Sequence, residues 1–212
     1  MCGRFTDYYT WRELVELYRL SDHIPARNLQ PRYNVAPTQD VPLCRLDGDG
    51  TREIVPLRWG LIPFWAKEEK IGYRTINVRV ETVHEKPAFR NAFKHRRCLI
   101  PTNGWYEWRQ EGKSKQPYLL SLPEPPFSLV GLWESWDGKN GEPQSFTIIV
   151  GRAAQSITDY HDRMPLVIEP ADYEAWLSPD TSPEQARDLM HHAYSGPFEV
   201  RKVSRRVNSP KN

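Results

Sequence analysis

The chain has 212 residues, of which 39% are hydrophobic, and it carries a formal net charge of +2. No apolar run approaches the roughly 20 residues that a membrane-spanning helix needs, and the charged start Cys2-Gly3-Arg4 differs from the apolar core of a secretory signal peptide. With so small a net charge, any affinity for nucleic acid must come from a local basic groove.

The three cysteines, Cys2, Cys44 and Cys98, are odd in number and far apart, which argues against a disulfide framework and against a zinc cluster. We expect no metal or other cofactor, and we expect Cys44 and Cys98 to be buried in apolar strands. Since no membrane or export signal is present, the protein is expected in the cytoplasm, associated with the nucleoid, or in the nucleus of a eukaryote. We predict a single domain over residues 1–212, with a core over 1–208 and a flexible tail over 209–212.

The first half of the chain predicts one helix followed by short strands. Thr10 and Glu13 form a capping-box pattern, and apolar residues then recur at helical spacing as far as Leu20. The remaining predictions are a turn-rich stretch over residues 21–37, strands over 41–46 and 53–60 joined by a turn at 47–50, an aromatic loop over 59–65, an extended segment over 75–82, and a short basic helix or loop over 89–97.

The centre of the chain is rich in strand-like segments. Strands are expected over residues 98–101, 104–109, 117–122, 127–133 and 145–151, with turns at 111–112 and 137–141. Short helices are expected over 153–160, 171–177 and 183–194, with a late strand over 198–203. These elements predict an α+β fold in which short helices flank a central antiparallel, barrel-like sheet.

Cys2 becomes the first residue if Met1 is removed. It would then carry an α-amine with a pKa of about 7.7–8.0 beside a thiol with a pKa of about 8.5. The amine can add to an aldehyde to give a Schiff base, and the thiol can then close on the imine carbon to form a thiazolidine. A cysteine near an N-terminus is more often an ordinary small residue. The rest of the chain must therefore decide between the two interpretations.

Glu107 and His161 are candidates for proton transfer. Glu107 lies between large aromatic residues on a predicted strand, where burial would raise its pKa toward neutrality; the alternative is a surface glutamate on an amphipathic strand. His161 could transfer protons near pH 7, although a histidine in a loop is more often structural.

Phe64 and Trp65 follow a proline and could stack on or wedge between bases, and core packing is the competing interpretation. The sequence has no glycine-rich phosphate loop, no paired zinc motif and no nucleophile elbow, so a nucleotide-driven enzyme or a serine hydrolase is unsupported.

Taken together, several stretches resemble the SRAP family (SOS response-associated peptidase), a family of abasic-site processing proteins. The matching stretches are residues 1–5, 32–37, 59–65, 77–81, 104–108, 161–165 and 203–208. They occur in the family's order and extend over essentially the whole chain. Each stretch is weak by itself, but the combination is highly specific.

The resemblance implies a DNA-repair protein of the SOS response that detects and shields abasic sites in single-stranded DNA. Met1 is removed by autopeptidase activity, and Cys2 forms a reversible thiazolidine crosslink with the ring-opened abasic deoxyribose, alongside a weak AP lyase activity. Asn77 is implied to hold the amine and the sugar, Glu107 to be the acid and base for imine formation and crosslink reversal, and His161 to assist opening of the sugar ring.

The resemblance also implies a DNA-binding surface on a monomeric protein whose partner is single-stranded DNA with abasic sites. Arginines contact phosphates and an aromatic pair forms a wedge. The implied DNA-binding residues are Arg4, Asn34, Phe64, Trp65, Arg79, Trp108 and Arg163.

Two other functions stay open at this point. One is a cysteine peptidase that uses Cys2 as an N-terminal nucleophile on itself or on other peptides. The other is a non-catalytic binder of nucleic acid.

Overall fold

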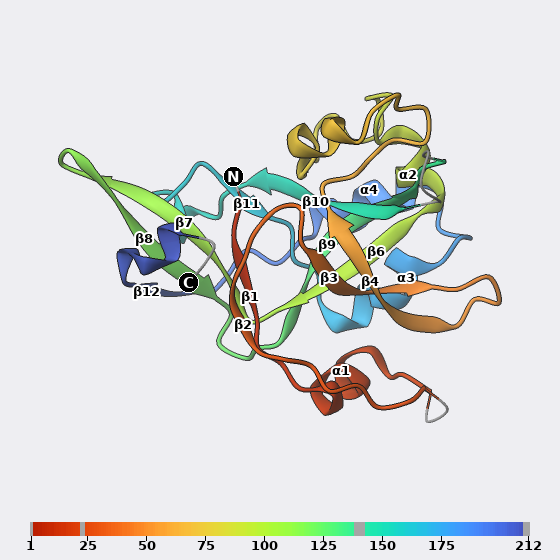
Figure 1. The fold of residues 1–212 in the computed structure, drawn as a ribbon, viewed down its shortest axis with the longest axis horizontal. Coiled ribbons are helices and arrows are strands. Elements are labelled where there is room, and N and C mark those ends of the chain that lie inside the picture. The colour runs from red at the N-terminus through yellow and green to blue at the C-terminus, as the bar shows by residue number, and fades with distance from the viewer. Residues whose placement is uncertain (1, 22–23, 138–142, 210–212) are drawn as a thin grey trace.

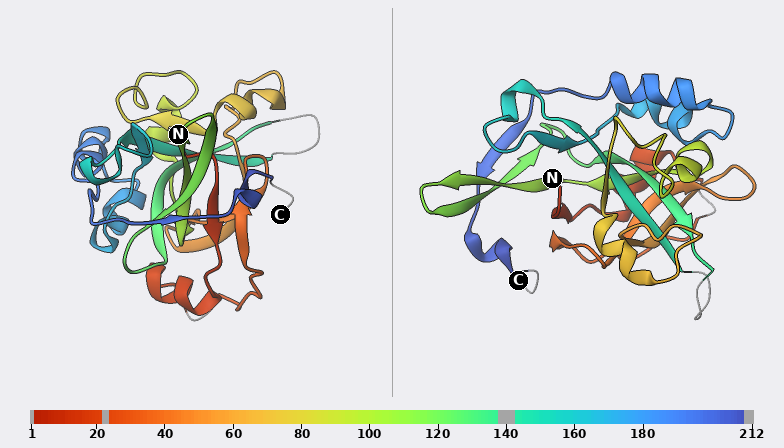
Figure 2. Two further views of the ribbon diagram at one scale, coloured as in Figure 1. Left: turned by 90° about the vertical axis from the view of Figure 1, so that its left-hand side faces the viewer. Right: turned by 90° about the horizontal axis from the view of Figure 1, so that it is seen from above.

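The structure is a computed structural model of the chain and describes residues 2–21, 24–137 and 143–209. Met1, most of the turn predicted over 137–141 and most of the tail predicted over 209–212 lie outside the described residues. The fold is a single α+β domain that consists mostly of strands. A larger sheet is surrounded by short helices, and a long hairpin projects from a smaller sheet beside it (Figures 1 and 2).

The smaller sheet is entirely antiparallel, with the strand order β12-β8-β7-β1-β2. Its strands are β1 (Phe5–Asp7), β2 (Arg32–Val35), β7 (Gly104–Glu111), β8 (Ser114–Ser121) and β12 (Glu199–Lys202). The N-terminal strand β1 therefore lies inside the sheet, between β7 and β2. The strands predicted over 104–109, 117–122 and 198–203 are confirmed, whereas β1 and β2 were not predicted.

The larger sheet has the order β11-β10-β4-β3-β6-β9, and β10 also pairs with β9 and β5, so the sheet closes on itself. Its strands are β3 (Asp40–Leu46), β4 (Arg52–Trp59), β5 (Asn77–Arg79), β6 (Arg97–Thr102), β9 (Phe127–Ser135), β10 (Gln144–Arg152) and β11 (Arg163–Pro165). Because β10 runs parallel to both β4 and β5, the sheet is a mixed, ring-like structure, which corrects the antiparallel, barrel-like sheet that we predicted.

The helices are short, as predicted. They are α1 (Trp11–Tyr18), α2 (Arg90–His95), α3 (Tyr173–Leu177) and α4 (Pro183–His191), together with the 3-10 helices η1 (Glu69–Arg74), η2 (Gln155–Ile157), η3 (Pro170–Asp172) and η4 (Arg205–Asn208). The capping box of α1 forms as predicted, and the helix ends at Arg19, whose φ of 49° is left-handed. The helix predicted over 153–160 is only the single turn η2.

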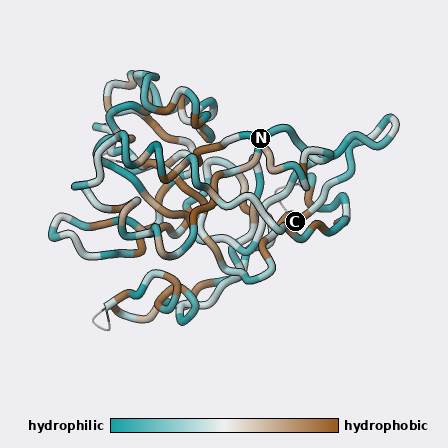
Figure 3. The backbone as a smooth tube through the Cα atoms, turned by 180° about the vertical axis from the view of Figure 1, so that it is seen from behind, coloured by the Kyte–Doolittle hydropathy of each residue, from teal (hydrophilic) through white to brown (hydrophobic). Residues whose placement is uncertain are grey.

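Buried apolar side chains form two clusters, one under the helices and one where the two sheets meet. The second cluster contains Cys2 together with Trp59 and Trp105, all of them fully buried. Cys44 and Cys98 are also buried, as predicted, and all three cysteines are free. Hydrophobic residues concentrate in the body of the molecule (Figure 3). Within the described residues, no helix combines the length and the apolar character needed to cross a bilayer.

Candidate functional site

Cys2 lies just before the inner strand β1, in the buried cluster where the two sheets meet. Phe5 pairs with Trp105 of β7, and the Tyr106 N–H donates to the Arg4 carbonyl at 2.9 Å. If the pairing of β1 with β7 is continued toward the N-terminus, Gly3, which follows Cys2, lies alongside Glu107. Burial raises the pKa of the Cys2 thiol well above its usual range, and the nearby charge of Glu107 raises it further.

Asn77 connects the larger sheet to this terminus. It lies on β5, opposite Ile148 of β10, and its Nδ2 donates to the Cys2 carbonyl at 2.6 Å. The extended segment predicted over 75–82 is a strand only as far as Arg79, since the Thr82 N–H donates back to the Arg79 carbonyl in a turn. Asn77 and Arg79 thus alternate with the buried Val78 and share one side of β5.

Glu107 is 3% exposed, which rules out the interpretation as a surface glutamate. Burial raises its pKa to about 7, so both of its protonation states are populated near neutral pH. The carboxyl lies at an open pocket whose lining residues are Glu107, Trp108, Lys115, His161 and Asn208. The structure therefore places the two predicted proton-transfer residues, Glu107 and His161, at one pocket.

His161 is held by the two residues that follow it. Its Nδ1 lies 2.8 Å from Asp162 Oδ1 and 2.9 Å from the backbone nitrogen of Arg163. Burial lowers the pKa of the ring, which favours the neutral form at neutral pH. With Nδ1–H donated to Asp162, Nε2 can accept a proton, and with Nδ1 accepting from Arg163, Nε2 can donate one. The ring can thus serve as a base or as an acid.

Three of the predicted DNA-binding residues contact the C-terminal segment. Their side chains donate to residues 207–209: Arg4 Nη1 to the Val207 carbonyl at 2.8 Å, Asn34 Nδ2 to the Ser209 carbonyl at 2.7 Å, and Trp108 Nε1 to Asn208 Oδ1 at 2.7 Å. Arg4 Nη1 also donates to Asn34 Oδ1 at 2.7 Å. Asn208 was not predicted as a site residue, although the stretch 203–208 was among those that carried the resemblance.

Phe64 and Trp65 occupy the two central positions of a turn in which the Ala66 N–H donates to the Pro63 carbonyl at 2.9 Å. Their side chains are 53% and 49% exposed, so core packing does not explain them. Gly60 enters this loop with a φ of +121°, and a Cβ there would lie 2.5 Å from the carbonyl oxygen of Gly72 in η1. Only glycine permits this close approach of the loop to η1.

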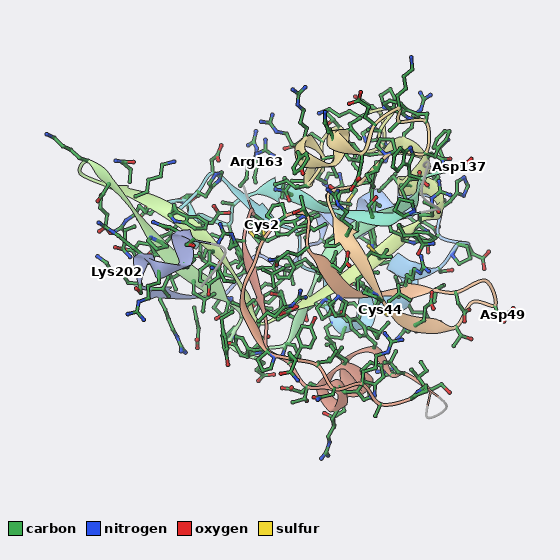
Figure 4. The ribbon with its side chains drawn as sticks, viewed as in Figure 1. Cys2, Cys44, Asp49, Asp137, Arg163 and Lys202 are labelled. Carbon is green, nitrogen blue, oxygen red and sulfur yellow. The ribbon has the colours of Figure 1, made fainter. Side chains whose placement is uncertain are left out.

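The two remaining arginines lie on neighbours of β10. Arg79 ends β5 and is exposed, and Arg163 begins β11, where its Nη1 donates to Glu81 Oε1 at 2.5 Å. In the view of Figure 4, Cys2 lies between the Lys202 end of the smaller sheet and the Cys44 part of the larger one. Across the described ranges, no group of three or more His, Cys, Asp and Glu side chains could hold a metal ion.

Comparison with known proteins identifies the family of this chain. The family described as SOS response associated peptidase (SRAP) matches residues 1–210. The chain is 41% identical to the abasic site processing protein YoaM of Bacillus subtilis, covering 100% of this chain and 95% of that protein, and 31% identical to the abasic site processing protein YedK of Escherichia coli, covering 100% and 96%. A crystal structure of a protein from Bacteroides thetaiotaomicron superposes with a TM-score of 0.83 at 27% identity, covering 100% of this chain and 97% of that one. The chain therefore belongs to the SRAP family of SOS response associated peptidases.

Proposed function

We propose that this protein captures abasic sites in single-stranded DNA as covalent adducts of Cys2, once Met1 has been removed. The observation that carries the proposal is that Asn77 and Glu107 meet at Cys2, while His161 lines the same pocket as Glu107. The names of the relatives YoaM and YedK, which match along the full chain, support the substrate class. All four side chains belong to one chain, so a monomer suffices.

The chemistry begins with the closed sugar of the abasic site. His161 accepts the C1′ hydroxyl proton at Nε2 as the C1′–O4′ bond breaks, and it returns the proton to O4′, which leaves an aldehyde at C1′. Asp162 is placed to pair with the transient imidazolium. Asn77 holds the Cys2 carbonyl, which orients the adjacent amine toward the pocket.

The amine of Cys2 then attacks C1′. Glu107, protonated in part because its pKa is about 7, donates a proton to the carbinolamine hydroxyl, which leaves as water and gives a protonated imine. The thiol adds to the imine carbon and its proton passes to the Glu107 carboxylate, so the aldehyde and the aminothiol yield a thiazolidine and one water. The same steps in reverse release the DNA. Loss of a C2′ proton and of the 3′ phosphate from the imine is β-elimination, the weak lyase reaction.

A denaturing gel tests this proposal. The processed protein is incubated with single-stranded DNA that contains one abasic site, and a shifted band should form with the unmodified chain and vanish with Cys2→Ala. Asn77→Ala and Glu107→Gln should slow its formation while the proteins stay folded. Absence of any Cys2-dependent shifted band would remove the proposal.

A peptidase that acts on its own N-terminus is a second candidate function, because the matching family is described as a peptidase. Glu107 is close to Cys2 and has a pKa suited to a general base at the Met1–Cys2 bond. Intact mass spectrometry of purified protein that retains Met1, compared with Glu107→Ala, tests it. Loss of Met1 at the same rate in both proteins would assign the cleavage to a separate aminopeptidase.

A further inference from the structure

One part of the molecule carries an excess of positive charge, and we call it the basic arm and define it as residues 104–121 and 199–209. This part contains β7, β8, β12 and η4. It carries seven Lys and Arg side chains and three Glu, a net charge of +4, whereas the whole chain carries +2. The other residues together therefore carry a net charge of −2.

Only some of the positive charge in the basic arm is neutralised by its own carboxylates. Glu111 pairs with Arg109 at 2.9 Å and with Lys202 at 3.1 Å, and Glu199 pairs with Arg201 at 3.0 Å. In the part of the chain that the structure describes, three further exposed cations of the arm form no ion pair with a carboxylate. They are Lys113, Lys115 and Arg205.

The basic arm begins at the candidate site and leads away from it. Its residues Glu107, Trp108, Lys115 and Asn208 line the pocket that contains His161. The hairpin then continues for five residues beyond Glu107 to its turn, a distance of about 16 Å at strand spacing. In both Figure 1 and the right-hand view of Figure 2, the hairpin and η1 lie on opposite sides of the N-terminus. A strand of DNA that crosses the pocket would thus meet the basic arm on one side and the loop of Phe64 and Trp65, which packs on η1, on the other.

We propose that the basic arm binds the phosphates of the DNA strand on one side of the abasic site. This inference rests on the proposed function. Phosphates are the partner because the three cations without an ion pair are exposed, and the projecting hairpin is hydrophilic along most of its length (Figure 3). Stacked nucleotides are spaced by about 3.4 Å along a strand, so 16 Å corresponds to about five nucleotides of flanking DNA.

Salt-dependent binding tests the proposal without covalent capture. The probe is a fluorescent single-stranded oligonucleotide with a central tetrahydrofuran site, which has no aldehyde. The double variant Lys113→Gln/Arg205→Gln is compared with Arg12→Gln/Arg27→Gln, which removes the same charge from the region of α1. At about 0.7 per lost phosphate contact, the slope of log affinity against log salt should become shallower by about 1.4 in the arm variant only. Equal slopes in the two variants would overturn the proposal.

A second measurement uses oligonucleotides with two nucleotides on one side of the site and a series of two to ten on the other, in both orientations. The arm variant should lose affinity for one orientation only, and the affinity of the unmodified protein for that orientation should stop rising at about five flanking nucleotides. Equal losses in both orientations would show a diffuse electrostatic effect and refute a directed arm. Crosslinking of the unmodified chain to a true abasic site, run in parallel, reports separately on the proposed function.

Discussion

Replacing Glu107 with glutamine should stabilise the protein above pH 7 and change its stability little below pH 4.5. Burial raises the pKa of this carboxyl from 4.5 to about 7. Between these two values the folded chain binds a proton that the unfolded chain has released, so the stability of the unmodified protein falls as pH rises through this window. Glutamine is similar in shape to the protonated carboxyl and has no charge to bury.

The size of the effect follows from the pKa difference of about 2.5. At about 1.4 kcal/mol per unit, the charged Glu107 costs the folded state about 3 kcal/mol above pH 7. Because the residue is only 3% exposed, solvent screening reduces this figure little. The variant should therefore be about 3 kcal/mol more stable than the unmodified protein at pH 8, and equally stable at pH 4.5.

Urea unfolding followed by tryptophan fluorescence measures this difference at several pH values between 4.5 and 8. Glu124→Gln is the control, since it removes an exposed carboxyl and relieves no buried charge. Equal m-values confirm that the variants unfold in the same way. If the stability difference between Glu107→Gln and the unmodified chain is the same at every pH, Glu107 titrates as an ordinary carboxyl and its assignment to proton transfer fails.

Three further outcomes are expected. Alanine at both Phe64 and Trp65 should lower the affinity for single-stranded DNA, measured by fluorescence anisotropy, by about 5- to 150-fold for each base that loses its stacking partner. Because both rings are exposed, the same change should alter the unfolding free energy by no more than about 0.5 kcal/mol. Asn77→Ala should slow crosslinking by roughly 10- to 100-fold in gel time courses, because the variant loses the hydrogen bond that holds the Cys2 carbonyl. The unfolding free energy measured in urea should change little. An unchanged crosslinking rate would contradict the positioning role of Asn77. Arg97→Met should lower the unfolding free energy, measured by urea unfolding, by about 3 kcal/mol or more, because the buried guanidinium donates to five backbone carbonyls. A loss below about 1 kcal/mol would show that water molecules satisfy these carbonyls in place of the guanidinium.

Elements that depend on neighbouring residues could be predicted from the sequence. The start of α1 follows from Thr10 and Glu13, and the hairpins β3–β4 and β7–β8 follow from glycine-containing turns between alternating strands. The strands β1 and β2 were missed because they have three and four residues and form through distant pairing, as between Phe5 and Trp105. The parallel pairing of β5 with β10 also links distant segments, with no helical crossover signal to reveal it.

The candidate site likewise combines residues that local chemistry could indicate with contacts between distant segments that it could not. Residue chemistry suggested Cys2, Glu107 and His161 one at a time, and the family resemblance added Asn77. No local pattern could show that Asn77 would contact the Cys2 carbonyl, because that contact requires the larger sheet to bring β5 to the start of β1. Asn208 was missed for a related reason, since a short polar segment near the C-terminus gives no sign of the side chains on which it will dock.

The position of β1 inside the smaller sheet determines how a captured strand could be pulled from the protein. Tension on DNA attached to Cys2 would act along β1, which is hydrogen-bonded to β2 on one side and to β7 on the other. Force in that direction shears both ladders at once, so their hydrogen bonds must break together and not one after another. Under the proposed function, the attachment point would therefore resist a force applied through the DNA, whereas unfolding that starts at the C-terminal end would first peel η4 and then the edge strand β12.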